Sequence, residues 1–101
     1  MEARDDIIRM VAANNWNAYT CRRVEGLGKA TVSPAECAAR VEPANAECIE
    51  IAKAKLPQVS TEDEAGFLVE ILMTCPVAKV LDIGYIIDGR KIHIQWNEIG
   101  R

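Results

Sequence analysis

Residues 60–75, Ser-Thr-Glu-Asp-Glu-Ala-Gly-Phe-Leu-Val-Glu-Ile-Leu-Met-Thr-Cys, are the stretch that most strongly determines the expected fold. Three carboxylates follow Ser60 and Thr61, which is typical of the first turn of a helix, where negative charge favours the positive end of the dipole. The apolar residues that follow cover more than one helix face, as in a helix buried at the centre of a bundle. We therefore expect a central helix over about 61–75 that begins at Ser60 and ends or bends at Pro76.

Toward the N-terminus, the sequence predicts further helices. Ser33-Pro34-Ala35-Glu36 is a capping box with proline at the first helical position, and it starts a helix over about 34–42. Pro43 either kinks this helix or separates it from a second one over about 44–56, which ends before Pro57. Near-helical apolar spacing predicts a first helix over about 3–25, in which the asparagines at 14, 15 and 17 could mark a bend.

Toward the C-terminus, the pattern changes to a β-hairpin over about 85–96. Asp88-Gly89 between two β-forming runs is a strong two-residue turn signal. Strand alternation then places the following residues on opposite faces: Ile92, Ile94 and Trp96 on one, and Lys91, His93 and Gln95 on the other. The expected fold class is mainly α, a three- to four-helix bundle with a short C-terminal β-hairpin, in a single domain over residues 1–101.

The sequence has four cysteines, Cys21, Cys37, Cys48 and Cys75. No two of them form a C-x-x-C pair, which argues against a zinc site and against a thioredoxin-type redox pair. We expect two disulfides, with free buried thiols as the alternative. The first choice of pairing is Cys21–Cys75 with Cys37–Cys48, and the second is Cys21–Cys48 with Cys37–Cys75. A helix continuous through Pro43 would exclude Cys37–Cys48, because eleven residues span about 16 Å.

Catalytic residue combinations are missing from the sequence. Its two serines, Ser33 and Ser60, are assigned as helix caps, and its single histidine, His93, falls on the polar face of the hairpin. We therefore expect no enzyme activity, no cofactor and no metal. The net charge of −3 and the lack of a basic stripe argue against nucleic-acid binding. No apolar stretch reaches the roughly 20 residues that a membrane-spanning helix needs, so no membrane insertion is expected.

The hairpin is the predicted binding surface. Aromatic and arginine side chains near a rigid turn are typical interface anchors, and an exposed strand edge can be extended by a partner. The candidate binding residues are Tyr85, Asp88, Arg90, Lys91, His93 and Trp96.

Two hypotheses of function follow. In size, helicity and cysteine count the chain resembles the periplasmic immunity proteins that bacteria use against peptidoglycan- or membrane-attacking toxins. This resemblance implies a small disulfide-braced inhibitor that occludes another protein, such as a toxin or an enzyme, in the periplasm or outside the cell after removal of a signal peptide. The alternative is a cytoplasmic helical adaptor or regulator with reduced cysteines, forming a homodimer through the 61–75 helix or the hairpin.

Thiol titration under denaturing conditions separates the two hypotheses. We expect no reactive thiol in the untreated protein and four after reduction, because disulfide-bonded sulfur does not react with the reagent. Four free thiols before reduction would contradict the inhibitor hypothesis.

Overall fold

The structure, a computed structural model, describes residues 3–26 and 32–95 of the chain. Within these ranges the chain forms four helices and then a two-stranded antiparallel hairpin, which confirms the predicted fold class. In chain order the elements are α1 (Ala3–Ala13), α2 (Trp16–Gly26), α3 (Pro34–Lys55), α4 (Glu62–Leu81), β1 (Tyr85–Asp88) and β2 (Lys91–Ile94).

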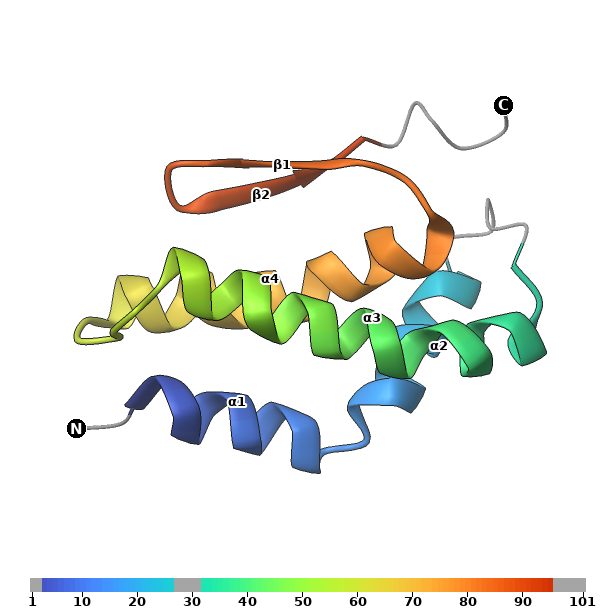
Figure 1. The fold of residues 1–101 in the computed structure, drawn as a ribbon, viewed down its shortest axis with the longest axis horizontal. Coiled ribbons are helices and arrows are strands. Elements are labelled where there is room, and N and C mark those ends of the chain that lie inside the picture. Colours follow the sequence, from blue (N-terminus) through green and yellow to red (C-terminus); the bar gives the residue numbers. More distant parts are fainter. Residues whose placement is uncertain (1–2, 27–31, 96–101) are drawn as a thin grey trace.

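The two long helices, α3 and α4, lie side by side and run in opposite directions, and α1 and the hairpin lie on opposite sides of this pair (Figure 1). Both helices begin at capping boxes. In this motif the side chain of the cap residue accepts from the backbone N–H three residues later, and the side chain of that later residue accepts from the backbone N–H of the cap. Ser33 Oγ accepts from the Glu36 N–H at 3.2 Å, as predicted. The cap of α4 is Thr61 rather than Ser60, and its Oγ1 accepts from the Glu64 N–H at 3.1 Å.

The predicted helix over 3–25 is two helices, because the chain turns at Asn14 and Asn15. Asn15 has φ 56°, in the left-handed region that asparagine adopts more readily than most residues. The Asn14 Nδ2 donates to the Met10 carbonyl at 2.7 Å and so satisfies one of the last acceptors of α1. The asparagines therefore mark a break rather than a bend.

Pro43 does not divide α3, which corrects the prediction of separate helices over 34–42 and 44–56. A proline inside a helix leaves the carbonyl four residues earlier without its donor. Here that carbonyl belongs to Ala39, and both Ala39 and Pro43 are exposed, so water can satisfy it. Buried residues on both sides of Pro43, among them Val41 and Ala44, hold the helix on its neighbours.

Pro76 does not end α4 either, and the helix predicted to stop near residue 75 continues to Leu81. The carbonyl that loses its donor is that of Leu72, which is fully buried. The Trp16 Nε1 donates to this carbonyl at 3.0 Å, and an Arg23 Nη donates to the next carbonyl, that of Met73. The Trp16 side chain of α2 therefore replaces the one hydrogen bond that Pro76 removes from α4, and Arg23 adds a second contact of α2 with the backbone of α4.

Two clusters of buried residues make up the core. The larger one brings α1, the start of α2, α3, α4 and β2 together around Leu68, Ile71 and Leu72. The smaller one brings α2, α3 and the last turns of α4 together around Val24, Val77 and Val80. The clusters meet at Pro76, because Cys75 belongs to the first cluster and Val77 to the second.

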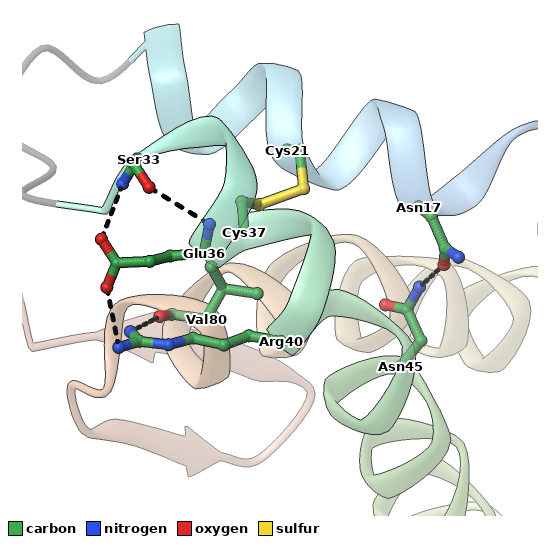
Figure 2. The surroundings of a disulfide bond; sticks show 8 residues. All are labelled: Asn17, Cys21, Ser33, Glu36, Cys37, Arg40, Asn45 and Val80. Atoms are coloured by element: carbon green, nitrogen blue, oxygen red, sulfur yellow. Dashed lines mark hydrogen bonds and ion pairs between the residues drawn. A yellow bond between two sulfur atoms is a disulfide. The ribbon is translucent and has the colours of Figure 1, made fainter.

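One disulfide lies within the larger core cluster and the other at the edge of the smaller one, and the pairing differs from both predicted pairings. Cys21 of α2 bonds Cys37 of α3, and Cys48 of α3 bonds Cys75 of α4. The predicted Cys37–Cys48 bridge is excluded because α3 is continuous, and the two cysteines instead face two different neighbours. Figure 2 shows the α2–α3 bond beside the Ser33–Glu36 cap.

We predict that limited reduction of the folded protein opens Cys21–Cys37 before Cys48–Cys75. Cys21 is half-buried beside a surface hollow of about 180 Å³, whereas Cys48 and Cys75 are both 0% exposed. Exchange requires a thiolate to reach the sulfur, so access controls the rate. Mass spectrometry of alkylated thiols after brief reduction in native buffer checks this, and early labelling of Cys48 and Cys75 would contradict it.

Candidate functional site

The hairpin divides its residues between an inner face against the helices and an outer face toward solvent. Tyr85 pairs with Ile94 and Ile87 with Ile92 on the inner face, and β2 packs against α4. On the outer face Ile86 lies opposite His93 and Asp88 opposite Lys91. All four outer-face residues are exposed. We call Ile86, Asp88, Lys91 and His93 the outer hairpin face.

The turn is shifted by one residue from the prediction. Asp88 and Lys91 pair as the last residues of the strands, so Gly89 and Arg90 form the turn in place of Asp88-Gly89. Gly89 has φ 61°, whereas Arg90 is not among the described residues with positive φ. Glycine at the first central position is typical of a type II′ turn. The sequence correctly indicated a turn at Gly89, but the predicted position of Gly89 within that turn was wrong.

The predicted binding residues therefore fall into separate groups. Asp88, Lys91 and His93 lie together on the outer hairpin face, while Tyr85 lies half-buried on the inner face. Trp96 lies outside the described residues. Sequence reasoning missed Ile86, which is 51% exposed and stands beside His93. Strand alternation in β1 could have identified it, since residue 86 shares a face with residue 88.

Two cation contacts attach the hairpin to the helices. At its base, the Lys79 Nζ lies 3.1 Å from a Glu47 carboxylate oxygen and 5.9 Å from the centre of the Tyr85 ring. At its tip, the Arg90 Nη2 lies 3.6 Å from the Glu64 Oε2. Arg90 is thus a tether between the turn and α4 as well as a candidate binding residue.

Glu64 serves the helix cap and the hairpin at once. Its Oε1 accepts from the backbone N–H of Ser60 at 2.9 Å and of Thr61 at 3.1 Å. The Ser60 N–H lowers the pKa of this carboxyl most, and Thr61 and Arg90 lower it further against the opposing effect of desolvation. Each contact favours the ionised form, so the pKa of Glu64 lies below its usual range.

A cleft of about 330 Å³ opens beside the hairpin tip, between β1 and the end of α3. Arg90 and Glu64 lie on its wall with the unpaired cation Lys55, which forms no ion pair within the described part of the chain. Phe67 contributes apolar surface. The full lining consists of Lys55, Leu56, Pro57, Gln58, Glu64, Phe67, Ile87, Gly89 and Arg90.

A second hollow, of about 220 Å³, lies at the elbow between α1 and α2 and is mainly apolar. Trp16, Tyr19 and Met73 line it together with Val11 and Asn14. The neighbouring Met10 is 64% exposed. Sequence reasoning did not identify this surface, because it depends on the break between the two helices.

Groups that could support metal or thiol chemistry do not come together in the described ranges. Within residues 3–26 and 32–95 no three His, Cys, Asp or Glu side chains form a group that could hold a metal ion. All four cysteines are disulfide-bonded. Across the same ranges, no helix has both the length and the apolar character needed to cross a bilayer.

Comparison with known proteins does not extend these observations. No protein-family model, curated protein or solved structure matches the chain.

We predict that Glu64→Gln makes the protein less sensitive to acid. A carboxyl with a lowered folded-state pKa stabilises the fold above its unfolded pKa of about 4.3, and this stabilisation is lost as pH falls through the folded pKa. Glutamine keeps the capping geometry but does not titrate. Denaturant unfolding at about pH 7 and about pH 3 should show a smaller acid loss in this variant.

The control is Glu62→Gln, which removes a carboxylate from the same first turn of α4 but breaks no ion pair of the described residues. Its acid loss should stay close to that of the unchanged protein. Equal acid losses in all three proteins would contradict the assignment of Glu64.

Proposed function

We propose that this chain is a binding protein that occludes a partner protein through the outer hairpin face. The observation that carries the proposal is the exposure of Ile86, Asp88, Lys91 and His93 on a short two-stranded ribbon. An exposed isoleucine beside charged and aromatic groups is typical of a surface that is covered in a complex.

The helical base supports this role because it holds the hairpin in place before binding. The inner face is anchored by Ile92, which is buried in the larger core, and by the contacts of Lys79 and Arg90. Two disulfides, each contributing about 3 kcal/mol, brace the helices underneath. A surface that is already ordered loses less conformational entropy on binding than a flexible one.

The more specific form of the proposal is an inhibitor in the periplasm or outside the cell, such as an immunity protein against a secreted toxin. Two disulfides are characteristic of oxidising compartments, and they support this choice over a cytoplasmic adaptor with reduced cysteines. The size, helicity and cysteine count agree with such proteins. Because an occluding inhibitor needs no catalytic group, we propose that the chain is not an enzyme.

The test uses the purified product of the adjacent gene. Under the immunity-protein hypothesis, that gene encodes the toxin that this chain inhibits. We expect a complex by calorimetry and inhibition of that protein's activity. Ile86→Asp and His93→Ala should each weaken binding by about tenfold or more, as for residues at the centre of an interface. The matched control is Glu42→Ala, at an exposed position of α3 outside the hairpin.

Absence of a complex would overturn the toxin-inhibitor form of the proposal. A complex whose affinity is unchanged by both hairpin variants would overturn the hairpin as the binding surface.

A further inference from the structure

The free edge of β1 carries backbone groups that have no partner strand. The Gln95 N–H donates to the Gly84 carbonyl at 2.9 Å, so this is a hydrogen-bonded pair of the ladder. Hydrogen-bonded and non-hydrogen-bonded pairs alternate in an antiparallel ladder, which makes Tyr85–Ile94 and Ile87–Ile92 the non-hydrogen-bonded pairs. The N–H and C=O groups of Tyr85 and Ile87 therefore point away from β2, toward the free edge.

The hairpin-tip cleft lies on this side of the ribbon. Ile87 of β1 lines it, and no residue of β2 does. A strand added to β1 would place the residue opposite Ile87 on the same sheet face as Ile87, and its side chain would point into the cleft. The next residue would lie beside the exposed Ile86 on the outer hairpin face.

Charge selects the side chain that fits the cleft. Its lining residues carry two cations, Lys55 and Arg90, and one anion, Glu64, which already pairs with Arg90 at 3.6 Å. Lys55 has no such partner within the described residues. A carboxylate from an incoming strand would pair with Lys55, whereas a cation would meet an excess of positive charge.

We propose that β1 accepts an extended segment of a partner protein, antiparallel to it, with an acidic residue in the cleft followed by a β-branched apolar residue beside Ile86. Backbone hydrogen bonds with Tyr85 and Ile87 hold the strand, and the cleft selects the carboxylate. The inference rests on the proposed binding function and names the chemistry of the partner at that hairpin.

The probe is the peptide acetyl-Lys-Glu-Val-Thr-Val-amide. In antiparallel register its lysine lies opposite Asp88, its glutamate opposite Ile87 and its first valine opposite Ile86. NMR titration should shift the amide signals of Tyr85 and Ile87 and slow their exchange with solvent. The same peptide with an N-methyl group on its glutamate keeps every side chain and loses the key donor, so it should not bind.

Charge exchange tests the cleft. Lys55→Glu, at an exposed position, should weaken binding of the glutamate peptide by about three- to tenfold, because attraction becomes repulsion. A peptide with lysine in place of glutamate should bind the Lys55→Glu variant more tightly than the glutamate peptide does, because the two charges are again opposite. The control is Lys53→Glu, which makes the same charge change on α3 outside the cleft lining and should leave peptide affinity unchanged.

Failure of this inference is distinct from failure of the proposed function. No binding of the peptide at about 1 mM, or equal effects of Lys53→Glu and Lys55→Glu, would overturn strand addition. If Ile86→Asp and His93→Ala still weaken the full partner complex while Lys55→Glu does not, the outer hairpin face binds without an added strand, and the inference alone is wrong.

Discussion

The buried proline of α4 imposes the constraint on which the tertiary arrangement depends. Pro76 lacks the N–H that would bond the Leu72 carbonyl, and burial of Leu72 excludes water as a substitute. The Trp16 indole supplies the donor, which fixes the start of α2 against the middle of α4. An unpaired buried carbonyl would cost about 1–3 kcal/mol, so this contact matters more than a surface hydrogen bond. The exposed Pro43 in α3 imposes no comparable requirement, since Ala39, whose carbonyl loses its donor, is itself an exposed residue that water can reach.

The two core clusters adjoin at Pro76, and one disulfide lies on each side of it along α4. The Cys48–Cys75 bond closes the larger cluster on the N-terminal side of Pro76, and the Cys21–Cys37 bond joins α2 to α3 beside the smaller one. The Arg40 guanidinium donates to the Val80 carbonyl at 2.9 Å near the end of α4, as Figure 2 shows. Because α4 is held along its whole length, it forms a firm base for the hairpin that follows it.

Much of the candidate site could be anticipated from particular residues, and the rest depended on distant contacts. Alternation in β2 correctly separated Ile92 and Ile94 from Lys91 and His93, because strand side chains alternate regardless of context. The role of Arg90 as a tether to Glu64 required knowing that the hairpin folds back over the first turn of α4. The hairpin-tip cleft joins residues from the end of α3, from α4 and from the turn, so no local pattern could indicate it.

The sequence by itself determined the helical class, the capping box at Ser33, the place of the hairpin and the presence of cysteines fit to pair, because each depends on residues close together in the chain. Only the tertiary structure decided that both internal prolines are tolerated, and hence which cysteines bond. Whether a proline breaks a helix depends on what satisfies the carbonyl it orphans. At Pro43 the residues concerned are exposed, so water can supply the donor. At Pro76 the donor is Trp16, which lies 56 positions from Leu72 in the sequence.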